Sequence, residues 1–214
     1  MSKLVTIVDY GIGNIFSVTR AFEHCGAEVL LTDKPQDVLA ASSLVLPGVG
    51  AFSNGMNGLH VRGLIEPLRE YAASGRPLLG ICLGMQMLFT ESTEFGEHRG
   101  LNIIGGRIVP IEPKGAGGEP LKVPHIGWSQ LMRTPDGPEW GSSILKHLNE
   151  EEDCYFVHSF TAVPDDEHHR LADTYYGSSR VSAAVAKGNV YGCQFHPEKS
   201  GVTGLKIIEG FLEF

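Results

Sequence analysis

Residues 77–86, PLLGICLGMQ, place Cys82 between Gly80 and Gly84 at the end of an apolar run. The G-x-C-x-G spacing is that of a nucleophile elbow, in which the chain leaves a strand, turns sharply and enters a helix. The residue at the turn is strained, and glycine on either side removes Cβ atoms that would clash there. The stretch therefore predicts a strand that ends near Cys82 and a helix that follows it.

The segments around this elbow predict an α/β fold. Apolar, strand-like runs alternate with helical patterns over the first ninety or so residues, which is typical of a mostly parallel central sheet flanked by helices on both faces. Ligands bind outside the carboxyl ends of the strands in such sheets, and Cys82 lies at one of these ends. Strands are predicted at 4–10, 27–33, 43–48 and 76–81, and helices at 14–25, 36–41, 59–74 and 83–91.

The second half of the chain is predicted to add β-rich elements. Short β-like runs occupy 103–111, 122–131 and 153–163, a hairpin occupies 180–195, and a last helix spans 202–212. The acidic run 150–153 and the charged cluster 165–169 are interpreted as solvated loops. The sequence has no internal repeat, low-complexity tract or linker, so we expect one domain over residues 1–214.

Charge and hydropathy exclude several classes of function. The net charge of −8 argues against nucleic acid or an anionic membrane surface as the main partner, since both favour a basic face. The N-terminal run reaches Asp9 too soon for a signal peptide, and no apolar run approaches the roughly 18 residues of a membrane span. The four cysteines are scattered without a C-x-x-C pair, which predicts a cytoplasmic protein with neither a zinc site nor a disulfide framework.

The segment QFHPE at 194–198 offers partners for Cys82. A thiol with a pKa of about 8.5 is only a few per cent thiolate at neutral pH, so a catalytic cysteine usually has a histidine beside it. In an extended segment His196 and Glu198 point to the same side, and Pro197 disfavours a helical His196. The alternative is a structural histidine beside an unrelated glutamate. With the elbow, a Cys82–His196–Glu198 triad is the favoured interpretation.

Acyl transfer to the thiolate also requires N–H donors for the developing oxyanion. The amide of Leu83 at the start of the helix is one natural donor, and the loop 47–50, PGVG, fits as the source of a second. Glycines on both sides of Val49 would let a peptide plane reverse, which predicts a switch between inactive and active loops. The alternative is a glycine-rich turn that is fixed in one form.

Gly11 and Gly13 resemble the start of a dinucleotide-binding fingerprint, G-x-G-x-x-G. Phe16 replaces the third glycine, and Asp33 is at best an ambiguous match to the acidic residue about 20 positions further on. Nucleotide binding is not favoured.

The motifs GICLGMQ at 80–86 and HPE at 196–198 resemble those of the class I glutamine amidotransferases, whose triad is Cys-His-Glu. Within this group, the chain resembles the family of glutaminase subunits of imidazole glycerol phosphate synthase, an enzyme of histidine biosynthesis. This second resemblance covers Asp9 to Ser200. The blocks that carry it are DYGIGN (9–14), PGVGAF (47–52), KVPHIGW (122–128), YFVHSF (155–160) and HPEKS (196–200).

The resemblance implies a glutaminase reaction without a cofactor or metal. Cys82 would form a thioester with glutamine, His196 would transfer protons, and Glu198 would orient His196. Val49 and Leu83 would supply the oxyanion N–H groups. The residues that would hold glutamine are Gly50, Gln86 and Glu94, although a solvated helix surface is the alternative for Gln86 and Glu94.

The resemblance also implies a partner. Ammonia would pass to a separate (β/α)₈-barrel cyclase subunit, with which the chain would form a heterodimer. The residues that match partner-facing positions are Asn14, Trp128, Tyr155 and Lys199. Ser129 stands where this family commonly has Asn, which affects one local hydrogen bond near the interface.

Two other interpretations remain. One is another class I glutaminase, such as that of pyridoxal phosphate synthesis, or a γ-glutamyl hydrolase; the blocks at 9–14 and 122–128 argue against both. The other is a redox-chaperone-type sandwich in which Cys82 is a sensor. The HPE segment argues against a sensor.

Overall fold

The apolar runs of the first half form a parallel sheet in the computed structural model, which describes residues 3–214. Three further strands extend the sheet antiparallel beyond β14, so that it has eight strands in total. The spatial order is β2 (Glu28–Thr32), β1 (Leu4–Val8), β3 (Leu44–Gly48), β4 (Leu78–Cys82), β14 (Val190–Cys193), β13 (Ser179–Lys187), β12 (Arg170–Tyr176) and β9 (Met132–Arg133).

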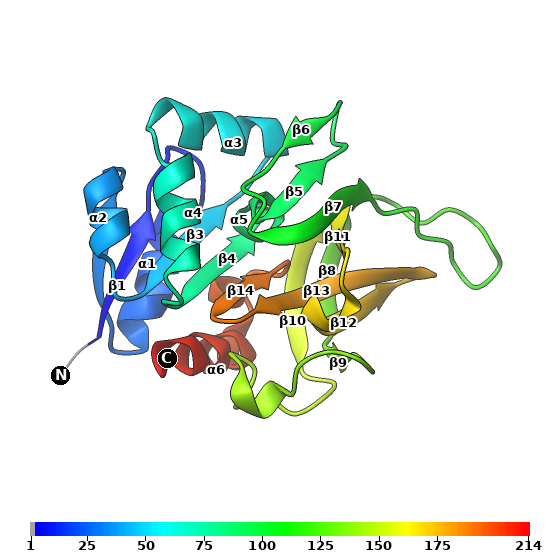
Figure 1. The fold of residues 1–214 in the computed structure, drawn as a ribbon. Coiled ribbons are helices and arrows are strands. Elements are labelled where there is room, and N and C mark those ends of the chain that lie inside the picture. The colour runs from blue at the N-terminus through cyan, green and yellow to red at the C-terminus, as the bar shows by residue number, and fades with distance from the viewer. Residues whose placement is uncertain (1–2) are drawn as a thin grey trace.

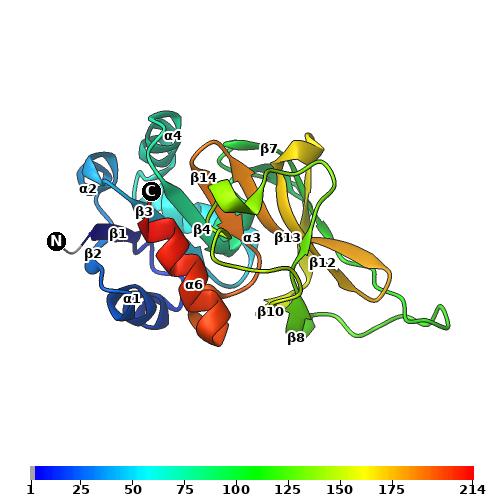
Figure 2. The same ribbon diagram turned by 90° about the horizontal axis from the view of Figure 1, so that it is seen from below.

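Helices cover both faces of the parallel strands. Figure 2 shows α1 and α6 side by side on one face, with α2 and α4 on the other. Side chains alternate between the two faces along each strand: Val45 packs with α1 and α6, whereas Leu44 and Leu46 pack on the opposite side. The helices are α1 (Ile15–His24), α2 (Pro35–Ala40), α3 (Phe52–Val61), α4 (Ile65–Ala73), α5 (Leu83–Met87) and α6 (Gly201–Leu212).

The β-rich elements lie beside this sheet, beyond β4 and β14 (Figure 1). They form a four-stranded sheet, a two-stranded sheet and three short 3₁₀ helices. The four-stranded sheet has the order β11 (Phe160–Pro164), β7 (Ile104–Pro110), β5 (Phe89–Ser92) and β6 (His98–Arg99). The two-stranded sheet pairs β10 (Asp153–His158) with β8 (His125–Gln130). The 3₁₀ helices are η1 (Trp140–Ser142), η2 (Glu167–His169) and η3 (Pro197–Lys199).

Two of the predicted helices were wrong in extent. The helix predicted at 59–74 is split into α3 and α4, because Gly63 adopts a left-handed conformation with φ +66° that ends a helix. The helix predicted at 83–91 ends as the five-residue α5. The chain then becomes strand β5, because its backbone pairs with β6 and β7.

Two predictions about strands also need correction. The run predicted at 153–163 is two strands, β10 and β11, which belong to different sheets and are separated at Ser159. Strand β12 was missed because its buried Arg170 and Asp173 interrupt the apolar pattern; these two side chains form an ion pair of 3.3 Å. The predicted hairpin is confirmed as β13 and β14.

Candidate active site

The elbow has the predicted backbone. Strand β4 ends at Cys82, which has φ 53° and ψ −109°, and α5 begins at Leu83. Both flanking glycines are required by close backbone approaches. A Cβ on Gly84 would lie 1.7 Å from the carbonyl oxygen of Leu46, and a Cβ on Gly80 would lie 2.8 Å from the amide nitrogen of Met85. The strained conformation places the thiol at the carboxyl end of a central strand.

Strand order brings the other site segments to the same place. Strand β4 lies between β3 and β14, so the loop after β3 and the segment after β14 flank Cys82 on opposite sides. Gly48 pairs with Cys82 across β3 and β4, and Cys193 pairs with Ile81 across β14 and β4. Three segments distant in sequence therefore converge at one edge of the sheet.

His196 and Glu198 form a buried pair. Nδ1 of His196 lies 2.8 Å from Oε1 of Glu198, and the two side chains are 2% and 1% exposed. They share a side as predicted, but the reason differs from the extended segment that was expected. The 3₁₀ helix η3 begins at Pro197 and turns the Glu198 carboxylate back towards the imidazole.

The environment of His196 favours the protonated ring. Burial alone would lower its pKa, but interaction with Cys82 and then with Glu198 outweighs burial and raises the pKa of His196 to about 9. The Nε2 atom has no hydrogen-bond partner of normal geometry among the residues that the structure describes. His196 therefore combines one anchored ring nitrogen with one that is free for proton transfer.

A cavity of about 280 Å³ brings most of the predicted site residues together. Cys82 and His196 line it, with segments from the second half of the chain closing the other side. The full lining is Val49, Gly50, Cys82, Leu83, Gln86, Glu94, Pro124, Val157, His158, Ser159, Phe160 and His196.

Gln86 and Glu94 are not on a solvated helix surface. Gln86 is buried and donates from Nε2 to Oε1 of Gln194 at 3.0 Å. Glu94 lies in the turn after β5, where its Oε2 accepts the amide of Phe52, the first residue of α3, at 2.6 Å. Both side chains are thereby fixed at the cavity.

Gln194 was missed by the sequence interpretation. Its Nε2 lies 3.7 Å from Sγ of Cys82, and its Oε1 accepts from Gln86, so it connects two cavity residues. The available signal was a glutamine inside a buried strand-like run, two positions before His196.

His158 lines the cavity but differs chemically from His196. Its Nδ1 lies 2.8 Å from the carbonyl oxygen of Phe160, and its Nε2 lies 3.0 Å from Nδ1 of His125. Both nitrogens are engaged, so of these two cavity imidazoles only His196 has a free one.

The residues predicted to face a partner lie around this site. Tyr155 and Trp128 are opposite each other on β10 and β8, with ring centroids 5.9 Å apart, and Trp128 is 56% exposed. The carbonyl of Tyr155 accepts the amide of His196 at 3.0 Å, which joins this sheet to the triad segment. Lys199 is exposed at the end of η3.

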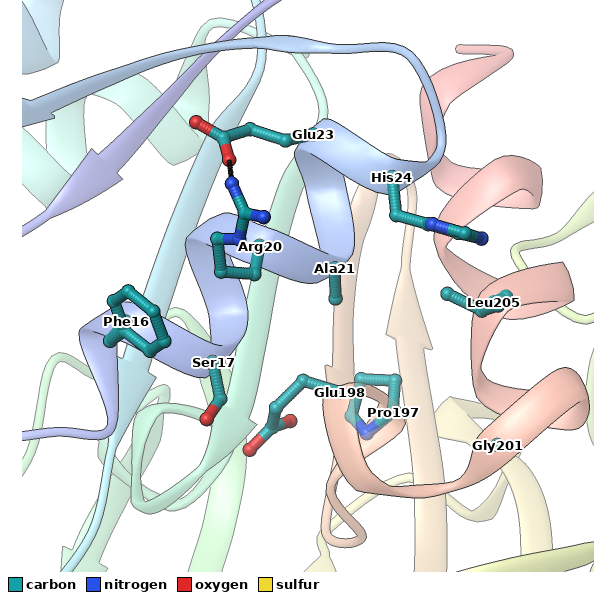
Figure 3. Close-up of a pocket in the computed structure, with 10 residues that line it drawn as sticks. All are labelled: Phe16, Ser17, Arg20, Ala21, Glu23, His24, Pro197, Glu198, Gly201 and Leu205. Atoms are coloured by element: carbon teal, nitrogen blue, oxygen red, sulfur yellow. Dashed lines mark hydrogen bonds and ion pairs between the residues drawn. The ribbon is translucent and has the colours of Figure 1, made fainter.

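Asn14, the fourth predicted partner residue, caps α1. Its Oδ1 accepts the amide of Ser17 at 3.4 Å. Helix α1 also forms one wall of a second, larger groove of about 620 Å³ behind the triad. Figure 3 shows Glu198 there, between Ser17 of α1 and Pro197. The groove reaches the triad carboxylate but not Cys82, so the chemistry is assigned to the smaller cavity.

Within residues 3–214, no group of three or more histidine, cysteine, aspartate or glutamate residues is placed to hold a metal ion. No helix in this described part of the chain is long and apolar enough to cross a membrane.

Comparison with families and curated proteins gives extended matches. The model of the family described as glutamine amidotransferase class-I matches residues 6–213. The chain is 51% identical over 209 residues to the imidazole glycerol phosphate synthase subunit HisH 1 of Legionella pneumophila (strain Paris), covering 98% of each. It is 47% identical to the subunit HisH of Syntrophotalea carbinolica, covering 97% of this chain and 98% of that one.

Solved structures show the same fold at low identity. A structure described as a glutamine amidotransferase matches with a TM-score of 0.72 and 18% identity, covering 98% of this chain and 97% of that one. The structure of PurLQS from Thermotoga maritima matches with a TM-score of 0.68 and 21% identity, covering 100% and 99%. These likenesses bear on the fold alone.

Proposed function

The chain belongs to the class I glutamine amidotransferase family and, within it, to the HisH subunits of imidazole glycerol phosphate synthase, and on this premise we propose that it is a glutaminase. It hydrolyses glutamine to glutamate and ammonia in histidine biosynthesis. The observation that carries the proposal is the convergence of Cys82 and His196 on one cavity, with Glu198 holding the far side of the imidazole. Residues 1–214 act as one amidotransferase domain in the cytoplasm.

The reaction proceeds by two acyl transfers. The Cys82 thiolate adds to the side-chain carbonyl carbon of glutamine, and the carbonyl oxygen becomes an oxyanion. The tetrahedral intermediate collapses to a γ-glutamyl thioester as the C–N bond breaks, and His196 gives its proton to the departing nitrogen, which leaves as ammonia. Glu198 stabilises the imidazolium and holds the ring in place.

The second step returns the enzyme to its starting state. The neutral His196 takes a proton from water, and the resulting hydroxide adds to the thioester carbon. Collapse of this second intermediate breaks the C–S bond and gives the Cys82 thiolate and the γ-carboxylic acid, which loses its proton to solvent to become glutamate, while the first proton is retained on His196. The amides of Leu83 and Val49 donate to the oxyanion in both steps.

The substrate is held by residues that line the cavity. Glu94 attracts the α-ammonium of glutamine, while Gly50 and Gln86 offer hydrogen-bonding groups along its length. Support comes from the fixed positions of Gln86 and Glu94 described above.

The partner is a separate (β/α)₈-barrel cyclase, with which the chain forms a heterodimer. Ammonia passes to it directly, because ammonia released into water at neutral pH becomes mostly ammonium. The proposed contacts are Asn14, Trp128, Tyr155 and Lys199, and support comes from the exposure of Trp128 and Lys199 beside the triad segment.

A direct test measures glutamate release by the isolated chain and by its complex with the cyclase subunit, with the cyclase bound to its own ligand. We expect the isolated chain to be nearly inactive and the complex to be faster by roughly 10²–10³, the effect of one oxyanion donor. Lys199→Ala should weaken the rise. A chain that releases no glutamate with any partner is not a glutaminase, and a redox-sensor role would then be favoured. Full activity in the isolated chain would remove the switch but leave the glutaminase.

A further inference from the structure

Three side chains connect the partly exposed strand β8 to the wall of the glutamine cavity. Oγ of Ser129 lies 3.0 Å from Nε2 of His125, and Nδ1 of His125 lies 3.0 Å from Nε2 of His158. Nδ1 of His158 lies 2.8 Å from the carbonyl oxygen of Phe160. This chain of hydrogen bonds begins at the half-buried Ser129, next to Trp128, and ends at the backbone of Phe160, a residue that lines the cavity.

The rings in this chain have fixed orientations. Both imidazoles are buried, with His125 2% and His158 5% exposed. His125 is stacked against Phe156 of β10 and Tyr176 of β12, with centroid distances of 5.2 and 4.3 Å and interplanar angles of 17° and 14°. Rotation of either ring would break a hydrogen bond in a buried site, which is costly.

The carbonyl oxygen of Phe160, at the cavity end of these hydrogen bonds, determines which ring nitrogens carry hydrogen. A carbonyl oxygen can only accept, so Nδ1 of His158 carries hydrogen and Nε2 of the neutral ring is an acceptor. Nδ1 of His125 must therefore donate to it, and Nε2 of His125 accepts from the hydroxyl of Ser129. Both rings are Nδ1–H tautomers.

Protonation of His158 would reverse the bonds to His125 and Ser129. Burial opposes it and outweighs the hydrogen bond to the Phe160 carbonyl, which favours the charged ring, so that the pKa of His158 is lowered to about 4; His125 and His196 contribute smaller effects in the same direction as burial. Burial also lowers the pKa of His125. At neutral pH, therefore, both imidazoles are neutral and the hydrogen bonds have the donors and acceptors given above.

The hydrogen bond from His158 to Phe160 spans the junction at Ser159, where the backbone passes from one sheet to another. Strand β10 ends at His158 and pairs with β8, while β11 begins at Phe160 and pairs with β7 of another sheet. Only Ser159 separates them, and the segment from Val157 to Phe160 forms one wall of the cavity. This hydrogen bond therefore links the end of β10 to the start of β11 across the junction.

We propose that His158, His125 and Ser129 are positioning residues for glutamine. Their hydrogen bonds, each with a fixed donor and acceptor, hold the junction between β10 and β11 at Ser159 in place. They thereby fix the cavity wall against which the substrate lies. The role rests on the proposed glutaminase function. It also accounts for Ser129, because a serine hydroxyl supplies a donor to His125 just as the amide of the Asn common in this family can.

A matched pair of variants separates the two bonds of His158. In His158→Asn the side-chain amide can replace Nδ1 and keep the donor to Phe160, whereas in His158→Gln it reaches the position of Nε2 and loses that donor. With the partner cyclase bound, we expect the KM for glutamine of the Gln variant to exceed that of the Asn variant about tenfold, the effect of one hydrogen bond. The kcat values should stay within about threefold of each other. Equal KM values in two folded variants would overturn the positioning role.

A second measurement does not depend on activity or on either variant folding. Nitrogen-15 NMR of the unmodified full chain at neutral pH should show both rings, assigned by their coupling to ring protons, as Nδ1–H tautomers. An Nε2–H tautomer at either ring would refute the directed chain. If the tautomers are as stated but the wild-type complex releases no glutamate, the proposed function fails and the hydrogen-bond chain stands.

Discussion

Nδ1 of His196 lies 2.8 Å from Oε1 of Glu198, and both side chains are almost completely buried. This contact determines which ring nitrogen can act. Nδ1 interacts with the carboxylate, whereas Nε2 has no hydrogen-bond partner among residues 3–214. His196 lines the same cavity as Cys82, so Nε2 is the nitrogen available for proton transfer there. The contact therefore gives His196 its orientation, while Cys82 and then Glu198 favour its charged form.

Loss of either member of this pair should affect kcat far more than KM. His196→Ala removes the proton carrier and is expected to lower kcat by roughly 10²–10⁴. Glu198→Gln keeps the shape but not the charge, so its effect should be smaller. Steady-state glutamate release by the complex measures both. Near-normal kcat in His196→Ala, with activity lost instead in His158→Ala, would require a different base.

The stability of the fold should depend on the protonation of His196. Its pKa is about 9 in the folded chain, above the ordinary 6.5 of the unfolded chain. The proton therefore contributes stability fully below about pH 6.5, and this contribution is lost as the pH rises from about 6.5 to 9. Urea denaturation across this range should show a decrease in the free energy of unfolding. His196→Ala should remove it, whereas an unchanged pH slope in that variant would contradict the assignment.

The elbow should tolerate no Cβ at position 84. Gly84→Ala would place a methyl group 1.7 Å from the carbonyl oxygen of Leu46, so we expect a loss of about 3 kcal/mol in the free energy of unfolding. Gly141 is the matched control, because a Cβ there meets no atom within 4 Å. Gly141→Ala should change stability by less than about 0.5 kcal/mol. Similar values for the two variants would show that the close approach is not maintained in solution.

The oxyanion role of Val49 can be separated from its side chain. Val49→Pro removes the N–H and should lower kcat in the complex by roughly 10²–10³. Val49→Ala keeps the N–H and alters only a side chain that is 37% exposed, so it serves as the control. Equal kcat values in the two variants would assign the second donor to another group.

The local part of the site could be predicted from sequence because its requirements are local. Glycines at 80 and 84 report the sharp turn at Cys82, and the strand order of an α/β sheet then places the segments after β3 and β14 on either side of it. The same reasoning brought Val49, Leu83 and His196 to one cavity.

The errors arose where distant pairing overrides local pattern. The residues after Met87 continue a helical pattern but become β5 because β6 and β7 supply hydrogen-bonding partners. Strand β12 was hidden by two buried charged residues, Arg170 and Asp173, which form an ion pair with each other; Asp173 also pairs with Arg180. His125 and His158 are 33 positions apart, so their hydrogen bond could not be predicted from spacing.

The central claim is that Cys82 is the covalent nucleophile, and alkylation by a chloroketone analogue of glutamine tests it most directly. Burial, with a smaller effect of neighbouring acidic groups, raises the pKa of Cys25 to about 11 and that of Cys154 to about 12, and burial also raises the pKa of Cys193. These three thiols should therefore react poorly. Mass spectrometry of the complex should find one label per chain, on Cys82, suppressed by glutamine and absent in Cys82→Ala. Labelling chiefly at Cys25, Cys154 or Cys193 would contradict the account.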